Sequence, residues 1–323
     1  MKQLPKVTRR VATLCLAATA LAATLPSALA QDMQTIRVER SPVGQFQGLF
    51  IAEELGYFKD RGIELDVSIG TSPDGALAQL MSNQKDVAMT GAAPLGAAVA
   101  NGLPVVAVLN AQDQNETPTF GFLVKPGSPI KTIEDLKGKK IGLPGIASPQ
   151  GAALLQTLED HGMTRDDVEL VNLPFPGVLS AIESGSVDAG IPIGLFYTLG
   201  EQQGYPEFKE VFDNAVQNAP AVFFAANKNW ADENADLLSR FIEAMALAYE
   251  YANEHPEKVR QIDGEQTKLP KDFIETRDIV PFEAGFDADA WNKQNEAFAK
   301  YEFISRIPES SEYIWSGALK QEN

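Results

Sequence analysis

Cysteine and histidine are almost absent from this sequence of 323 residues, which has one cysteine, Cys15, and two histidines, His161 and His255. Cys15 lies in an N-terminal segment that we expect to be removed, so the mature chain would have no disulfide, thiolate metal site or cysteine nucleophile. Neither histidine has a partner at the spacing that a metal site or a catalytic triad requires, and we expect both at the surface. The sequence therefore predicts no catalytic residue, no metal and no cofactor.

Positive charge is also scarce, with 27 basic residues against 44 acidic ones. The first 30 residues contain four basic residues and no acidic one, so the remaining chain has 23 basic residues and a net charge of −21. Such a surface repels phosphate backbones, and we expect no nucleic-acid partner. Long apolar runs are missing after the N-terminus, so we expect no other segment to enter a membrane.

The N-terminus has the three parts of a secretory signal peptide. A basic head precedes an apolar run from Val11 to Leu25, and the small residues Ala28-Leu29-Ala30 follow it; the head contains Lys2, Lys6, Arg9 and Arg10. This pattern predicts cleavage after Ala30 and export across the inner membrane into the periplasm. The alternative is a membrane anchor, but spanning a bilayer takes roughly 20 apolar residues. The 293 residues that remain are enough for two packed domains without disulfides.

Short apolar strands alternate with helices along most of the chain, which predicts an α/β fold with mostly parallel sheets covered on both faces. The alternation restarts near Thr119, and after Phe224 the pattern is helical only. We expect strands at 35–39, 63–69, 87–89, 104–109, 120–124, 140–143, 168–172 and 189–192, and helices at 46–61, 73–82, 94–100, 133–136, 149–161 and 177–183. The restart predicts a discontinuous lobe 1, residues 31–117 with 224–323, and a lobe 2 inserted at 118–223.

Two segments about a hundred positions apart resemble each other. The pattern Leu77-x-x-Leu80-x-Ser82-x-x-x-Asp86-Val87 matches Leu179-x-x-Ile182-x-Ser184-x-x-x-Asp188-Ala189. Upstream of each, Ile63-Glu64-Leu65 matches Val168-Glu169-Leu170. Each copy has the order strand, helix, turn and next strand, so the echoes favour two lobes of similar construction.

Three predicted helix starts share one local pattern. Ser72-Pro73, Ala93-Pro94 and Ser148-Pro149 each follow a predicted strand and open a predicted helix. Proline is suited to the first helical turn, and a preceding serine can cap the free amides. Ligands of open α/β sheets bind beyond the carboxyl ends of the strands, where helix N-termini attract anions. The alternative at each loop is ordinary capping with water in the site.

Arg40 ends the first predicted strand, on the same face as Ile36 and Val38. A guanidinium beside the expected cleft could hold an acid group through two parallel hydrogen bonds, whereas the alternative is a structural ion pair. Aromatic residues in or near the same loops could hold an apolar ligand body, or could belong to the core. The expected ligand-binding residues are Arg40, Ser41, Gln45, Phe46, Ser72, Gly91, Ala92, Phe120, Ala147, Ser148, Phe175 and Phe196.

An ordered set of motifs across about residues 35–255 resembles one family of proteins. The motifs include Gly48-Leu49-Phe50-Ile51-Ala52, Gly56-Tyr57-Phe58-Lys59, Gly102-Leu103-Pro104-Val105-Val106, Ile133-Glu134-Asp135-Leu136-Lys137-Gly138-Lys139-Lys140-Ile141-Gly142 and Gly185-Ser186-Val187-Asp188-Ala189. The chain is thereby similar to the sulfonate, nitrate and thiamine-pyrimidine branch of periplasmic binding proteins. The resemblance implies the type II binding-protein fold, hinge closure around a small molecule, and delivery to an ABC permease with its ATPase. We expect a monomer.

Within that branch, the start of the chain is most similar to pyrimidine binders, whose pattern Trp-x-Pro-Asn-x-x-His-x-Gly aligns with residues 40–48. Arg40 replaces the stacking tryptophan, Val43 the asparagine and Phe46 the histidine. A cation in place of a flat ring favours a small anionic solute, a sulfonate or carboxylate with an aromatic or apolar portion. Two alternatives stay open: a binder of a thiamine-precursor pyrimidine, and an exported enzyme on the same scaffold.

Overall fold

The computed structural model describes residues 33–42, 44–70, 72–114 and 119–321. Residues Gln34–Asn323 form one compact unit. The predicted signal peptide, residues 1–30, lies outside the described residues. Among the helices that are described, none is both long and apolar enough to cross a membrane.

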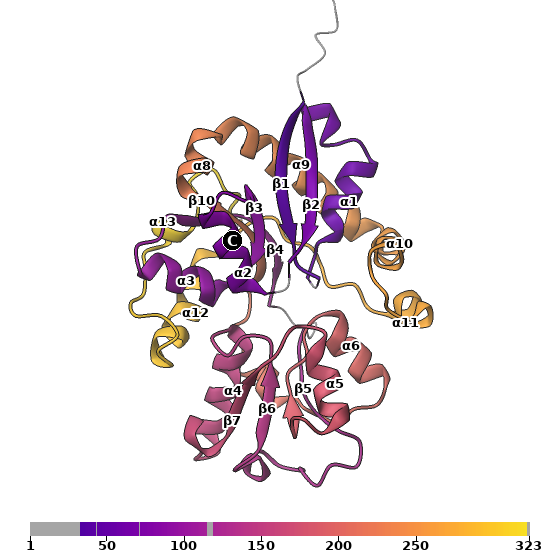
Figure 1. The fold of residues 1–323 in the computed structure, drawn as a ribbon, viewed down its shortest axis with the longest axis vertical. Helices are drawn as coiled ribbons and strands as arrows, with labels where there is room; N and C mark the ends of the chain where they lie inside the picture. The colour runs from indigo at the N-terminus through magenta and orange to yellow at the C-terminus, as the bar shows by residue number, and fades with distance from the viewer. Residues whose placement is uncertain (1–32, 43, 71, 115–118, 322–323) are drawn as a thin grey trace, which may run out of the picture. The chain divides into compact units, whose positions relative to one another are not determined.

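The first sheet has five strands, in the upper half of Figure 1. Their order is β2 (Ile63–Ile69), β1 (Gln34–Arg40), β3 (Val87–Thr90), β10 (Pro220–Asn227) and β4 (Val105–Asp113). Strands β2 and β3 pair with β1 in parallel, whereas β10 is antiparallel to both β3 and β4. Every residue of β4 is buried, as expected for a strand covered on both faces.

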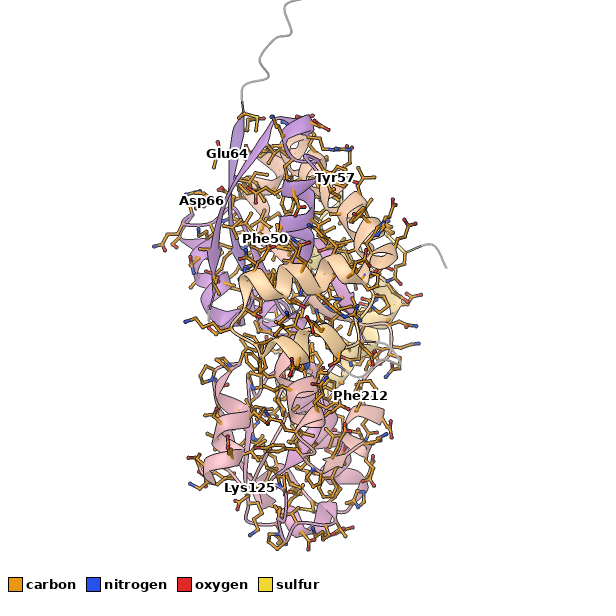
Figure 2. All side chains as sticks on the ribbon, turned by 90° about the vertical axis from the view of Figure 1, so that its right-hand side faces the viewer. Phe50, Tyr57, Glu64, Asp66, Lys125 and Phe212 are labelled. Atoms are coloured by element: carbon orange, nitrogen blue, oxygen red, sulfur yellow. The ribbon has the colours of Figure 1, made fainter. Side chains whose placement is uncertain are left out.

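The edge strand β2 carries acidic side chains on its outer positions. Figure 2 shows Glu64 and Asp66 standing out from this strand, and both are exposed. Charged side chains on an edge strand discourage pairing with a second chain.

Helices cover the first sheet, and α1 (Gln47–Glu54) packs against α9 (Ala235–Glu254). The two helices approach closely at Gly48, where an added Cβ would lie 2.8 Å from Cδ1 of Tyr249. The predicted helix over 46–61 is shorter than expected, because Gly56 takes a left-handed turn with φ of 78°. A 3-10 turn, η1 (Lys59–Arg61), follows, and Gly62 ends it with φ of 68°.

The second sheet also has five strands and lies in the lower half of Figure 1. Their order is β7 (Glu169–Asn172), β6 (Lys140–Leu143), β8 (Ala189–Gly190), β5 (Phe122–Val124) and β9 (Glu207–Phe208). The elements around it are α4 (Pro149–Asp160), α5 (Gly177–Ser184), α6 (Leu195–Gln202), α7 (Glu210–Asp213), η2 (Ile133–Leu136) and η3 (Arg165–Asp167). Phe212, labelled in Figure 2, joins the apolar core of this sheet, and Lys125 at its outer end donates to the carbonyl oxygen of Glu183 at 2.6 Å.

The two sequence echoes occupy equivalent places in the two sheets. The carboxylate of Asp86, before β3, accepts the backbone N–H of Arg37 in β1 at 2.8 Å. The carboxylate of Asp188, before β8, accepts the backbone N–H of Lys140 in β6 at 2.9 Å. Each aspartate ties the start of one strand to its parallel neighbour, so the similarity of construction that the echoes predicted is confirmed.

The C-terminal region is helical, as predicted. After β10 come α8 (Lys228–Glu233), α9, α10 (Pro256–Gln266), α11 (Lys271–Thr276), α12 (Ala288–Lys300) and α13 (Ser310–Tyr313). Two of these helices reach elements of the second sheet. Lys300, at the end of α12, contacts Glu159 of α4 at 2.6 Å, and Phe273 of α11 shares an apolar cluster with Leu195 of α6.

Four of the five strands in each sheet run in one direction, as the prediction of mostly parallel sheets requires. Each sheet is nevertheless mixed, because β10 in the first sheet and β5 in the second run against both of their neighbours. Strand β10, which begins at Pro220 and separates β3 from β4, is not among the strands expected from the sequence. A strand that returns to a sheet from the far side of an insertion carries no local signal of its direction. The lobe boundaries at 117/118 and 223/224 stay a prediction.

Candidate solute-binding cleft

A cavity of about 320 Å³ opens where strands of both sheets end. From the first sheet it is bordered by residues that follow the carboxyl ends of β1, β2 and β3, among them Ser41, Gly70 and Gly91. From the second sheet it is bordered by the segments after β6 and β7, including Ser148 and Phe175. This is the place where α/β sheets bind ligands, and we call it the cleft.

Three helices start at the cleft. Oγ of Ser72 accepts the N–H of Gly75 at 3.1 Å at the start of α2 (Pro73–Met81), and Oγ of Ser148 accepts the N–H of Gly151 at 3.0 Å at the start of α4. These two caps confirm the predicted helix starts. The third helix, α3 (Ala92–Ala100), begins earlier than predicted, with Gly91 as its N-cap. The positive ends of three helix dipoles therefore face one cavity.

Arg40 does not line the cleft, which corrects the expectation from the sequence. Its side chain is 2% exposed, and its guanidinium donates to the carbonyl oxygens of Ser41 at 3.1 Å and Gln266 at 3.3 Å. Its Cζ lies 4.1 Å from the centre of the Phe46 ring. Burial lowers the pKa of Arg40. Among the described residues it forms no ion pair within 4.0 Å; its direct contacts are carbonyl oxygens and aromatic rings, and the more distant charge of Asp263 raises its pKa against the effect of burial.

The alternation of β1 explains this correction. Arg40 shares a face with Ile36 and Val38, as predicted, but that face turns toward α1 and the core. The neighbouring residue, Glu39, takes the opposite face and borders the cleft. Glu39 is not among the residues expected from the sequence, although the same alternation places it at the cleft once the face of β1 that packs against the core is known.

Glu39 is a nearly buried carboxyl group, 3% exposed. Its Oε2 accepts a short hydrogen bond from Nε2 of Gln79 in α2. Its Oε1 lies against Gly70, where an added Cβ would overlap it. Burial raises the pKa of Glu39, while the bond from Gln79 and the charge of Lys85 lower it.

Six of the twelve expected residues line the cleft: Ser41, Ser72, Gly91, Ala147, Ser148 and Phe175. The other six are placed elsewhere. Gln45 borders an adjacent cavity of about 30 Å³ and donates to the carbonyl oxygen of Val280 at 2.5 Å.

Three of the remaining residues, Phe46, Ala92 and Phe120, belong to the protein interior, which for the two aromatics is the alternative interpretation. Phe46 and Ala92 are buried in the core of the first sheet. Phe120 is buried in the second sheet, with its ring 5.3 Å from that of Phe212. Phe196 is half-buried outside the cleft. Phe46 and Phe120 fill the cores, where burial of their large apolar area is stabilising, whereas Phe175 lines the cleft.

The cleft is poor in charge. Among the described residues that line it, Glu39 carries the one ionisable side chain, and none is basic. Neutral polar groups such as Gln112, Gln150 and Asn172 add donors and acceptors to a mostly apolar wall. Within the described chain, no group of three or more His, Cys, Asp or Glu residues could hold a metal ion.

Comparison with known proteins agrees with this geometry. A protein of Haemophilus influenzae, provisionally named for thiamine biosynthesis, is 25% identical over 305 residues, which cover 90% of this chain and 93% of that protein. The 4-amino-5-hydroxymethyl-2-methylpyrimidine phosphate synthase THI5 of Saccharomyces cerevisiae is 26% identical over 253 residues, 71% of this chain and 70% of the relative.

Among solved structures, the alkanesulfonate-binding protein SsuA from Xanthomonas axonopodis pv. citri, bound to MOPS, superimposes with a TM-score of 0.70. The two chains are 17% identical, and the match covers 87% of this chain and 98% of that one. The fold is therefore that of the periplasmic binding proteins, with two α/β sheets and a helical C-terminal region. Residues 44–259 match the NMT1/THI5-like family, and the chain belongs to that family.

Proposed function

We propose that this protein is the periplasmic solute-binding component of an ABC importer. One observation carries the proposal: a single cavity of about 320 Å³ lies at the carboxyl ends of strands from both sheets, with three helix N-termini facing it. A cavity of this size suits a small organic molecule. The exported location follows from the signal peptide that the sequence predicts, and delivery to a permease follows from the family.

The ligand that the cleft supports best is a small heteroaromatic molecule such as a thiamine-precursor pyrimidine. Apolar walls that include Met89, Phe175 and Val222 suit a flat ring, and neutral polar groups suit its edge. The relatives named for thiamine biosynthesis and pyrimidine synthesis support the same chemistry. The anionic solute favoured by the sequence loses its main support, because the Arg40 guanidinium faces the core.

A sulfonate or carboxylate stays the second candidate ligand, and the three helix N-termini favour it. Backbone N–H groups at the starts of α2, α3 and α4 could hold an acid group without a basic side chain. Under this alternative, Glu39 would have to lie beyond the reach of the acid group or be protonated.

Ligand capture involves closure of lobe 2 on lobe 1 in this proposal. The sheets are linked at the ends of β4 and β10, where the N–H of Gln114 donates to the carbonyl oxygen of Ala219 at 2.9 Å. A ligand that contacts both walls would favour the closed arrangement by its differential affinity for it. Small-angle scattering should then show a smaller radius of gyration with ligand than without.

The test fills the cleft with a side chain. Gly91 borders the cavity in an extended conformation, and a Cβ there meets only Cδ of Pro94 at 4.0 Å, so Gly91→Trp should fold and occupy the site. The matched control is Gly264→Trp on the exposed face of α10, where a Cβ meets no atom within 4 Å. The mature chain and both variants would be screened by thermal shift against pyrimidines, sulfonates, carboxylates and nitrate.

A true ligand at a hundredfold excess over its Kd should stabilise the wild type and Gly264→Trp by about 2.7 kcal/mol, and Gly91→Trp hardly at all. Equal stabilisation of all three proteins would place binding outside the cleft and refute the proposal.

An exported enzyme is the candidate from another class, because the yeast relatives are named as synthases. Mass spectrometry of the solute before and after prolonged incubation with the protein separates the two functions. Recovery of the intact solute supports binding alone, and conversion at a rate that Gly91→Trp abolishes supports catalysis.

A further inference from the structure

We propose that Glu39 is the specificity-determining residue of the cleft: its carboxyl group selects solutes that present an N–H donor, and it disfavours sulfonates and carboxylates. The inference rests on the proposed binding function and specifies how the site distinguishes its ligands. It starts from the observation that Glu39 is the one ionisable side chain among the described residues of the lining.

The carboxyl group is held in place by three neighbouring elements. Its backbone belongs to β1, which is paired on both sides, with β2 and β3. Gln79 in α2 donates to Oε2, and Gly70, which follows β2, leaves the space that Oε1 occupies. Gly70 also borders the cleft, so the carboxyl group lies at the wall next to the ligand space. A fixed acceptor costs little further conformational entropy when a ligand binds.

Burial makes this acceptor selective. At 3% exposure, Glu39 has lost most of its water and gains one hydrogen bond from Gln79 in return. An amino group of the ligand would donate a second hydrogen bond to this carboxyl group, which has little access to water. A ligand without that donor leaves a buried acceptor without its second hydrogen bond. Binding sites that hydrogen-bond a polar group of the ligand reject analogues that lack this group.

An anionic ligand meets the opposite situation. No basic side chain is present in the described lining to offset the charge of Glu39. Lys85, whose charge lowers the pKa of Glu39, lies outside that lining and 3.9 Å from its own partner Asp66. Like charges repel strongly in a site with little water. A sulfonate therefore has to bind with Glu39 protonated, or bind weakly.

The experiment compares three ligands on four proteins by calorimetric titration. The ligands are 4-amino-5-hydroxymethyl-2-methylpyrimidine and the same molecule without its amino group, with ethanesulfonate as an anionic probe. The proteins are the wild type, Glu39→Gln, Gly70→Ala and Glu64→Gln. Glu64→Gln removes the same charge from the exposed edge strand β2, so it controls for net charge (Figure 2).

In the wild type and in Glu64→Gln, removal of the amino group should raise Kd at least about tenfold, because a hydrogen bond to a charged group is lost. In Glu39→Gln the ratio of the Kd without the amino group to the Kd with it should fall toward one. Ethanesulfonate should bind Glu39→Gln more tightly than it binds the wild type. Gly70→Ala keeps the charge but displaces Oε1, so it should weaken the aminopyrimidine without improving the sulfonate. The melting temperature of each unliganded variant separates ligand recognition from loss of structure.

The outcomes separate the two proposals. If the ratio of the two pyrimidine Kd values, without and with the amino group, is equal in the wild type and in Glu39→Gln, the proposed role of Glu39 is wrong and solute binding is unaffected. Tight binding of ethanesulfonate to the wild type, lost in Gly91→Trp, does the same. Failure of all three probes to bind any of the four proteins overturns the aminopyrimidine proposal itself.

Discussion

Replacement of Arg40 by alanine should destabilise the protein and leave ligand affinity almost unchanged. The guanidinium makes two hydrogen bonds to carbonyl oxygens, each worth about 1.5–3 kcal/mol when one partner is charged, and a contact with the Phe46 ring worth up to about 2 kcal/mol. Part of this is offset, because the variant no longer buries a charge. We expect a net loss of about 2–3 kcal/mol in the free energy of unfolding.

Thermal denaturation of the mature chain measures this loss. For a chain of this size, 1 kcal/mol changes the melting temperature by about 2–4 °C, so Arg40→Ala should melt roughly 5–10 °C lower than the wild type. Arg40→Met keeps the apolar stem over Phe46 without the charge and should recover part of the difference. Calorimetric titration supplies the second measurement. A variant that melts like the wild type but has lost its ligand affinity would show that Arg40 acts in the cleft and would refute the reasoning.

Three further predictions concern packing, capping and titration. Gly48→Ala should lower the free energy of unfolding by about 1–3 kcal/mol, because its Cβ would overlap Tyr249 and separate α1 from α9; denaturant unfolding checks this, and an unchanged midpoint contradicts it. Ser148→Ala should cost about 1 kcal/mol through loss of the cap on Gly151, with Ser186→Ala on an exposed loop as a control that should cost less. His161 should titrate above the ordinary histidine pKa, because Glu134 accepts its hydrogen bond at 2.8 Å. The contribution of His161 to stability is present below its pKa in the unfolded chain and is lost as pH rises through its pKa in the folded protein. NMR titration of His161 in Glu134→Gln should show its pKa return toward 6.5.

Much of the local structure could be predicted from the sequence, because it depends on neighbours in the chain. Strand β2 has the predicted bounds Ile63–Ile69, and the caps at Ser72 and Ser148 form as expected. The echoes at Asp86 and Asp188 correspond to equivalent bonds between adjacent parallel strands. Each of these features follows from period, cap chemistry or spacing within a few turns of chain.

The candidate site could be predicted only in part. Helix starts at Ser72, Gly91 and Ser148 reach the cleft because the carboxyl ends of parallel strands point to one side of a sheet. The aromatics were not predictable in this way: Phe46 and Phe120 lie in sequence next to cleft residues, yet their side chains fill the cores. Position in a loop says nothing about the direction of a side chain.

The sequence by itself determined the alternating α/β elements, the family and the helix starts that border the cleft. The tertiary structure decided which face of β1 turns toward the core. As a result Glu39, and not Arg40, borders the cleft. The physical reason is that alternation assigns residues to two faces without saying which face meets a helix layer and which meets the ligand. That choice depends on packing against segments distant in the chain: Arg40 contacts Phe46, at the start of α1, and Gln266, at the end of α10, whereas Glu39 accepts a hydrogen bond from Gln79 of α2.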